Sequence, residues 1–289
     1  LTTVQDVTKI QELEHTIRMK LAQKGLVASY HFDDIKTEDA AMKALIKRAK
    51  TIAGFEGSVL IYGENGTGKE LFAQSIHNAS RRRERPFVAV NCAALSESLL
   101  ESELFGYVAG AFTGARSEGK AGLFELAHQG TIFLDEINSM PMGLQAKILR
   151  VIEQQEVMRV GSDYVIPLDV RIIAASNGNL TRSIRENQFR KDLFFRLNTF
   201  QLNIPPVKER KGDIVPLFKY YLAELRGCRA EDILLSPSFE EELLAHHWLG
   251  NVREIKSAAL RYHAFDGDNS CGEIIQNGQA DEGLVDEEL

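Results

Sequence analysis

The sequence predicts a doubly wound α/β domain followed by a small α-helical domain. Three observations carry this prediction. Between about residues 32 and 206, short apolar runs alternate with helical patterns, which is typical of a parallel sheet covered by helices on both faces. A glycine-rich loop directly follows one of the apolar runs and directly precedes a helical pattern. After Pro205 and Pro206, helical patterns continue without strands.

The expected strands are short and apolar, as buried strands should be. We expect them over 59–62, 87–90, 131–134, 171–176 and 199–202. Helical patterns fill the α/β domain over 40–52, 69–80, 97–104, 119–126 and 142–155, and the second domain over 213–226, 238–246 and 251–264. One further helical pattern covers 8–24 and suits a short coiled coil, packing on an upstream domain or packing on its own core.

The chain divides into four predicted segments. They are an N-terminal linker helix (1–31), an α/β subdomain (32–206), a small α-helical subdomain (207–265) and an acidic tail (266–289). Eight of the 41 acidic residues lie in the tail, which leaves 33 against 34 Lys and Arg and a net charge of +1 elsewhere. We expect the tail to be disordered because it has many charges and few apolar residues.

Composition restricts the class of protein. With 289 residues, of which 44% are hydrophobic, the chain can bury a substantial core. Apolar runs stay well short of 18 residues and no N-terminal signal is visible, so we expect a soluble, cytoplasmic protein without membrane contact. The three cysteines lack metal or redox spacing and are interpreted as reduced thiols. The chain begins with Leu1, which suggests a fragment of a longer protein.

The glycine-rich loop is the strongest chemical signal. It comprises Gly63, Glu64, Asn65, Gly66, Thr67, Gly68, Lys69 and Glu70. Its glycines let backbone N–H groups turn toward phosphate oxygens at a helix N-terminus, and Lys69 can reach the β- and γ-phosphates. The sequence therefore predicts nucleoside triphosphate binding. Glu70 replaces the Ser or Thr that usually holds Mg²⁺, so we expect it to meet the metal through water or to face elsewhere.

A second motif places two carboxylates at the end of the strand over 131–134. Asp135 is suited to hold Mg²⁺, and Glu136 to orient and polarise the attacking water. The alternative is a solvated acidic cap. Asn177 ends the strand over 171–176 and could bridge the γ-phosphate and the water, or could be an ordinary turn residue.

Two arginines could supply positive charge where negative charge develops in phosphoryl transfer. Arg190 and Arg196 are six residues apart, which does not place them on one helical face. An arginine that acts across a subunit boundary is a known device for accelerating hydrolysis. The alternative is a surface ion pair with Asp192 or Glu186.

Nucleotide chemistry does not account for the small-residue loop Gly110, Ala111, Phe112, Thr113, Gly114 and Ala115. Glycines near both ends allow such a loop to swing. An exposed phenylalanine is costly unless it meets an apolar partner, which favours a binding role for Phe112. The alternative is a tight turn in which Phe112 is buried.

With these residues assembled, the chain closely resembles the central AAA+ ATPase domain of bacterial sigma-54-dependent transcriptional activators, the enhancer-binding proteins. The resemblance runs from about Phe32 to Phe265, and its most specific element is the GAFTGA sequence at 110–115. The flanking Glu103-Leu-Phe-Gly106 is also typical, and the phosphate loop of this family ends in Glu, as it does at Glu70.

The resemblance implies a P-loop ATPase that binds ATP and Mg²⁺ and forms a hexameric ring. It implies sensor roles for Asn177 and for Arg253 on the lid, trans-acting finger roles for Arg190 and Arg196, and a restraint of Glu136 by Asn91. The phosphate-loop residues and the carboxylates Asp135 and Glu136 keep the roles given above. The loop 110–115, through Phe112 and Thr113 above all, would contact sigma-54 and remodel the closed promoter complex.

The chain departs from this family at several places. Leu249 stands where the lid motif usually has Pro, and Tyr107-Val-Ala109 stands where charged residues are common. Nothing after residue 265 resembles the helix-turn-helix domain of the family, so DNA binding is expected only through a domain absent from this chain. The alternative is that this member acts without binding enhancer DNA. Asp6-Val-Thr8 and the following helix resemble the exit of a PAS sensor domain.

Two alternatives to a sigma-54 activator stay open. Another AAA+ ring remodeller, such as an unfoldase or a helicase loader, would explain the nucleotide motifs but not the GAFTGA loop. A nucleotide-binding signalling scaffold without turnover would not need intact carboxylates at 135–136 and both arginines.

Overall fold

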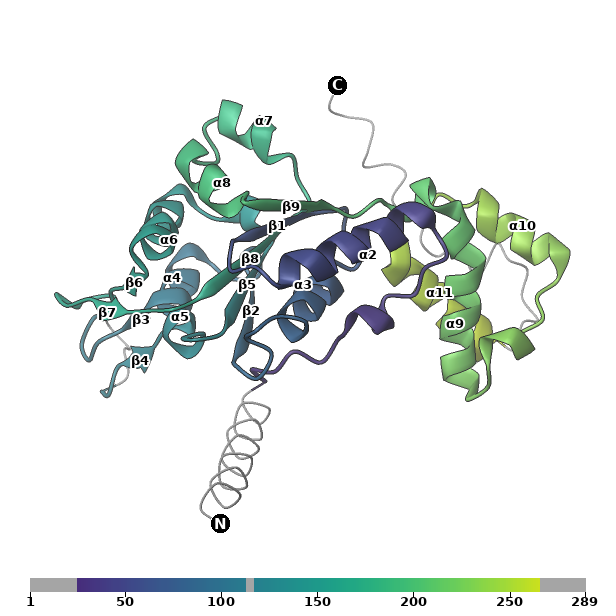
Figure 1. Ribbon diagram of the computed structural model, residues 1–289, viewed down its shortest axis with the longest axis horizontal. Helices are drawn as coiled ribbons and strands as arrows, with labels where there is room; N and C mark the ends of the chain where they lie inside the picture. Colours follow the sequence, from purple (N-terminus) through teal and green to yellow (C-terminus); the bar gives the residue numbers. More distant parts are fainter. Residues whose placement is uncertain (1–24, 113–116, 266–289) are drawn as a thin grey trace, which may run out of the picture. The chain divides into compact units, whose positions relative to one another are not determined.

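The computed structural model describes residues 25–112 and 117–265 (Figure 1). The expected helix over 8–24, the residues Thr113, Gly114 and Ala115 and the acidic tail lie outside the described residues. The described chain forms two compact units. The sheet unit contains 25–35, 46–62 and 69–203, and the lid unit contains 36–45, 63–68 and 204–265.

The sheet unit is built on five parallel strands. Their order is β2–β5–β8–β1–β9, and their bounds are Val59–Tyr62 (β1), Phe87–Asn91 (β2), Thr131–Asp135 (β5), Arg171–Ser176 (β8) and Phe200–Asn203 (β9). All five expected strands are present. The bounds of β1 and β8 agree with the predictions, β2 and β5 are one residue longer at their ends, and β9 is shifted by one residue. The order requires crossover connections, which the intervening helices provide.

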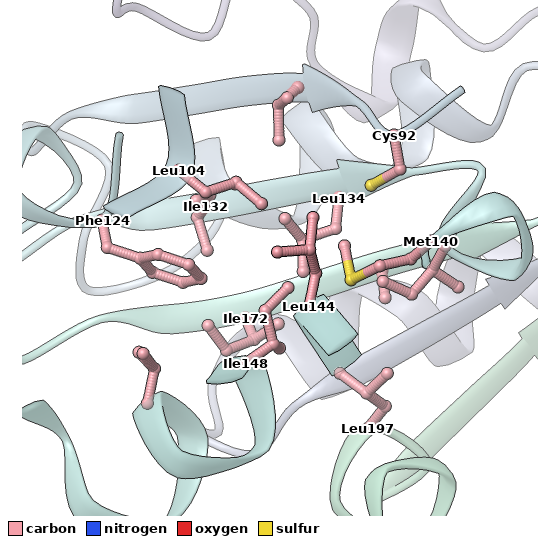
Figure 2. Packing of buried hydrophobic residues seen from close by; sticks show 14 of the residues in the cluster. Cys92, Leu104, Phe124, Ile132, Leu134, Met140, Leu144, Ile148, Ile172 and Leu197 are labelled. Atoms are coloured by element: carbon pink, nitrogen blue, oxygen red, sulfur yellow. The ribbon is translucent and has the colours of Figure 1, made fainter. Parts of the chain in front are cut away.

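Alternate residues of each central strand point to opposite faces of the sheet, and both faces are covered. On one face, Ile132 and Ile172 join a large core with side chains from the neighbouring helices, such as Phe124, Leu144 and Leu197 (Figure 2). On the other face, Phe133 stacks on Phe87, whose ring meets His77 of α3. The predicted doubly wound α/β fold is thereby confirmed.

Three helices of the sheet unit agree with predicted helical patterns, one predicted helix is wrong, and the last two helices were not expected from the sequence. In chain order, these helices are α3 (Lys69–Asn78), α4 (Glu97–Phe105), α5 (Leu123–Leu126), α6 (Met142–Gln154), α7 (Leu180–Arg185) and α8 (Lys191–Leu197). The prediction of a helix over 119–126 is wrong, because 120–121 is a strand and α5 is a single turn. Gly119 has φ 70°. Gly122 packs so closely on the preceding turn that a Cβ on it would lie 2.4 Å from the carbonyl carbon of Phe105. These two glycines prevent a continuous helix.

Two short antiparallel pairs were not expected from the sequence. β3 (Gly106–Tyr107) pairs with β4 (Lys120–Ala121), and β6 (Glu156–Val157) pairs with β7 (Ile166–Pro167). An isolated bridge links Tyr107 of β3 to Val160, which lies in the connection between β6 and β7. Two-residue strands carry too little periodicity for sequence analysis to detect.

The lid unit is helical. α9 (Ile214–Arg226), α10 (Pro237–Ala245) and α11 (Asn251–Ala264) surround a core that includes Phe218, Phe239 and Trp248. Ser236 caps α10 by accepting a hydrogen bond from Phe239 N, and Pro237 occupies the first helical position, where its missing N–H costs nothing. The remaining helix, α2 (Ala40–Ala53), begins among residues of the lid unit and ends among those of the sheet unit.

Within the described part of the chain, we find no helix with the length and apolar character needed to cross a bilayer.

Candidate functional site

The carboxyl edge of the sheet carries the two acidic residues of the predicted water and metal site. β5 ends at Asp135, whose Oδ1 accepts a hydrogen bond from Glu136 N at 2.9 Å. Glu136 has φ 52° and ψ 45°, a left-handed conformation that is uncommon for a residue other than glycine. Such backbone strain gathers at functional sites, and here it turns the chain sharply after the strand.

Asn91 and Asn177 lie at the same edge, because β2 and β8 flank β5 and run parallel to it. Asn91 is the register partner of Asp135, and its Oδ1 accepts a hydrogen bond from Ala93 N at 2.8 Å. Asn177 directly follows β8, where Ser176 Oγ lies 3.1 Å from Asn138 Oδ1. The fold therefore gathers all four predicted residues, while the restraint of Glu136 by Asn91 stays a prediction.

Cys92 lies next to the two carboxylates at this edge, directly after β2. Its side chain is buried, and burial raises the pKa of the thiol to about 12, with the carboxylates of Asp135 and Glu136 adding to the shift. The thiol therefore stays protonated at neutral pH, which excludes it as a nucleophile.

Lys69 is the first residue of α3 and is 7% exposed. The N-terminal end of a helix favours anions, so a lysine placed there suits a phosphate group. Glu70 lies one position further on, and its Oε1 accepts a hydrogen bond from Gln74 Nε2 at 2.9 Å. Gln74 Oε1 in turn accepts from Ser29 N at 2.7 Å. Glu70 thus faces along its own helix, and Gln74 is a supporting residue that sequence analysis missed.

The loop 63–68 belongs to the lid unit and runs without a break into α3. Gly66 and Gly68 have φ 79° and 101°, values that residues with a side chain rarely adopt. Thr67 Oγ1 donates to the Glu64 carbonyl at 2.8 Å, which closes the turn. A Cβ on Gly63 would lie 2.7 Å from that same Oγ1. The loop is a backbone cradle of the kind that holds phosphate groups.

Residues of the lid unit hold this loop from outside. Asn251 donates through Nδ2 to Glu64 Oε2 and to the Asn65 carbonyl, both at 3.1 Å, and Lys208 pairs with Glu64 at 2.9 Å. These partners hold the pKa of the Glu64 carboxyl below its usual range, with Lys208 as the largest cause. Arg253, the predicted lid sensor, is an exposed residue in the first turn of α11. Sequence analysis named Arg253 but missed Asn251.

Both predicted finger arginines form surface ion pairs in this structure. Arg190 directly precedes α8 and donates two hydrogen bonds to the carboxylate of Asp192, at 3.0 and 2.7 Å. Arg196 donates to Glu153 at 2.9 Å. Asp192 was one of the two acidic partners considered from the sequence, whereas the other, Glu186, pairs with Arg182. Exposed pairs of this kind contribute little to stability and break at small cost.

The loop that begins at Gly110 comes after β3 in the chain, and β4 follows it. Phe112 remains 46% exposed, and its ring packs edge-to-face on Tyr107 with centroids 4.9 Å apart. Val108 N donates to the Val160 carbonyl at 3.1 Å, so the segment after β6 supports the start of the loop. Phe112 is thus neither buried in a tight turn nor without an aromatic neighbour.

Two families match the chain, one after the other. The family described as sigma-54 interaction domain matches residues 35–203, and the AAA+ ATPase lid domain matches residues 208–273. The first match alone covers more than half of the chain.

Curated relatives and solved structures point to the same family. The chain is 49% identical to the sigma-54-dependent transcriptional regulator SfnR of Pseudomonas fluorescens over 76% of its own length and 60% of that protein. It is 44% identical to the regulatory protein AtoC of Escherichia coli over 89% of its own length and 56% of that protein. NtrX from Brucella abortus, solved in complex with ATP, is similar with a TM-score of 0.75 and 31% identity over 91% of this chain and 59% of that one. The chain therefore spans less than two thirds of the length of these proteins.

Proposed function

The chain belongs to the sigma-54 interaction family of AAA+ proteins, and we propose that it hydrolyses ATP to remodel sigma-54 RNA polymerase through the loop Gly110–Ala115. One observation carries the ATPase part of this proposal. A glycine cradle leads directly into a helix that begins at a buried lysine, and the parallel strand β5 of the same fold ends in Asp135 and Glu136. Phosphoryl transfer requires these two elements, one for the phosphates and one for the water and metal.

The proposed roles follow from the chemistry of each group. Backbone N–H groups of 63–68 and the Lys69 ammonium bind the phosphates, and Glu136 orients the attacking water. Asp135 offers a carboxylate at the strand end, which fits a hard cation such as Mg²⁺. When bound, Mg²⁺ supplies charge neutralisation at the phosphate oxygens. Asn91 and Asn177 sense the γ-phosphate from the same edge, and Arg253 does so from the lid.

We place Arg190 and Arg196 at the nucleotide of a neighbouring subunit in a hexameric ring. Both guanidinium groups are exposed, and each is held by an exposed acidic partner. Exchange of a surface carboxylate for a phosphate is therefore inexpensive and yields the stronger charge-assisted interaction.

The partner-binding part of the proposal rests on Phe112. Its half-exposed ring sits at the end of a short β arm, and it belongs to the six-residue sequence that marks the family. The loop engages sigma-54 when the γ-phosphate is present and is withdrawn after hydrolysis. ATP can drive this change only if it binds the two loop states with different affinity.

The ATPase proposal is tested with two substitutions. Lys69→Ala removes the phosphate contact, and we expect loss of ATP binding in a direct titration. Glu136→Ala leaves the phosphate loop intact, and we expect normal ATP affinity with turnover reduced by about 100-fold or more. Near-normal turnover of Glu136→Ala would exclude it as the residue that activates water.

The partner proposal is tested with Thr113→Ala. We expect unchanged ATPase activity and loss of sigma-54 binding in the presence of a transition-state analogue. The matched control is Ser117→Ala, an exposed residue just beyond the loop, which should bind sigma-54 normally. Retained binding by Thr113→Ala would remove the support for this role of the loop.

A further inference from the structure

We infer that Asn251 is a positioning residue that sets the shape of the phosphate loop from the first turn of the lid helix α11. The inference rests on the proposed ATP binding by residues 63–68 and assigns its dependence on a residue outside the loop. Every contact that carries it lies within the lid unit.

The side chain of Asn251 is fully occupied by the chain around it. Nδ2 donates to Glu64 Oε2 and to the Asn65 carbonyl at 3.1 Å, and Oδ1 accepts from Val207 N at 2.7 Å. Asn251 is completely buried. One side chain therefore connects three segments, namely the phosphate loop, the start of the lid and the beginning of α11. Because a buried polar group that loses its partner is costly, these three segments are held in one arrangement.

The backbone of Asn251 shows that this arrangement is specified. Its φ is 53°, a left-handed value that asparagine tolerates better than most residues. An aliphatic residue here would add backbone strain and leave Val207 N and the Asn65 carbonyl without the bonds described. Asparagine is thus suited to the position for two separate reasons, its conformation and its paired donor and acceptor.

Neighbouring contacts extend the connection along the loop. Val252 N donates to the Gly66 carbonyl at 3.1 Å. A Cβ on Gly66 would lie 2.1 Å from the Gly250 carbonyl oxygen and 3.2 Å from Cβ of Arg253. Residues 64, 65 and 66 are therefore each bonded to residue 251 or 252, in the same helical turn as Arg253. If two positions of this turn give the loop different affinities for phosphate, phosphate binding favours one of these positions by the same free energy.

The decisive experiment uses the reciprocal pair Asn251→Asp and Glu64→Gln. Asn251→Asp keeps the shape and the acceptor for Val207 N but places a carboxylate against Glu64. We expect ATP affinity to fall by about tenfold or more. In the double variant with Glu64→Gln, the new amide at position 64 can donate to the new carboxylate at position 251, which reverses the direction of the wild-type hydrogen bond. We expect this double variant to recover most of the lost ATP affinity. Glu64→Gln also removes the ion pair with Lys208, so the ATP affinity of this single variant is the reference for the double variant.

Two further variants separate conformation from hydrogen bonding. Asn251→Gly retains the left-handed φ and deletes the side chain, so we expect weakened ATP binding. Asn187→Gly is the matched control, since Asn187 has φ 57° in an exposed turn of the sheet unit. Affinity is measured by titration well below each melting temperature, so that a lower stability alone does not change the result.

The outcomes distinguish the two proposals. If the wild-type chain fails to bind ATP, the proposed function is wrong and the role of Asn251 falls with it. If the wild type binds ATP and the folded Asn251→Asp and Asn251→Gly variants bind it equally well, only the positioning role is wrong. The positioning role is also wrong if Glu64→Gln fails to improve the affinity of Asn251→Asp.

Discussion

The sheet unit and the lid unit hold their proposed nucleotide residues by different means. In the sheet unit, Asp135 stands at the end of a strand that is hydrogen-bonded on both sides, to β2 and to β8. In the lid unit, Gly66 stands in a loop whose position depends on side-chain and backbone bonds from Asn251 and Val252. Regular structure places the groups proposed to act on water, whereas specific packing shapes the cradle proposed to bind phosphate. The first group is placed by the backbone hydrogen bonds of a sheet, and the second depends on a few contacts from one turn of α11.

The difference predicts that the two units lose stability separately. Phe124 lies in the core of the sheet unit and Phe218 in that of the lid unit, and both are completely buried. We expect Phe124→Ala and Phe218→Ala each to cost about 4 kcal/mol, mainly through the cavity left behind. Hydrogen exchange resolved by residue should show the loss in the substituted unit. Equal loss of protection in both units after either substitution would show that they unfold as one.

A pair of substitutions within the loop tests how much the lid determines its shape. Gly66→Ala introduces strain at positive φ and a clash with the Gly250 carbonyl, and should cost about 3 kcal/mol. Gly68 also has positive φ, but among the described residues nothing lies within 4 Å of a Cβ placed there. Gly68→Ala should therefore lower the free energy of unfolding by only about 1 kcal/mol. Denaturant titration measures both values. Equal costs would mean that strain alone, and not the lid contact, governs the loop.

Lowering the pH should reduce the stability of the sheet unit through the buried His77. Burial lowers the pKa of His77 to about 4, with Arg171 and Arg82 contributing. The unfolded chain takes up the proton near pH 6.5 and the folded chain does not, so stability present above pH 6.5 is lost as the pH falls toward 4. Between pH 7 and pH 5 the loss should be about 2 kcal/mol. His77→Gln should flatten this dependence in denaturant titrations at several pH values, and an unchanged slope would assign the effect to other groups.

The smallest expected effect on stability comes from Arg196→Ala. Its ion pair with Glu153 is exposed, so stability should change by less than about 0.5 kcal/mol. Its ATPase activity should nevertheless be lost, and should recover in part when Arg196→Ala subunits are mixed with Lys69→Ala subunits. No recovery at any mixing ratio would contradict action across a subunit boundary. Together with the preceding substitutions, this variant separates groups that support the fold from groups reserved for the nucleotide.

Sequence analysis located the strands and the residues at their ends because both depend on local patterns. The run 131–134 is apolar, and the two acids that follow it must lie at the carboxyl edge of a parallel sheet. The family signature at 110–115 was equally visible in the sequence. The β3–β4 arm was not, because its two-residue strands lack periodicity and the glycines at 119 and 122 resemble interruptions of a helix.

The sequence by itself determined the fold class and the family, and it predicted the phosphate loop and the acidic pair, since strand periodicity and motif spacing are properties of neighbouring residues. Only the tertiary structure decided that Glu70 turns to Gln74, that Phe112 rests on Tyr107 and that Asn251 bonds to Glu64 and Asn65. Asn251 and Glu64 are separated by 187 positions, and their hydrogen bond exists because packing of the lid unit brings them within reach. No local sequence pattern predicts a contact between residues so far apart, so the role that we infer for Asn251 could be recognised only from the tertiary structure.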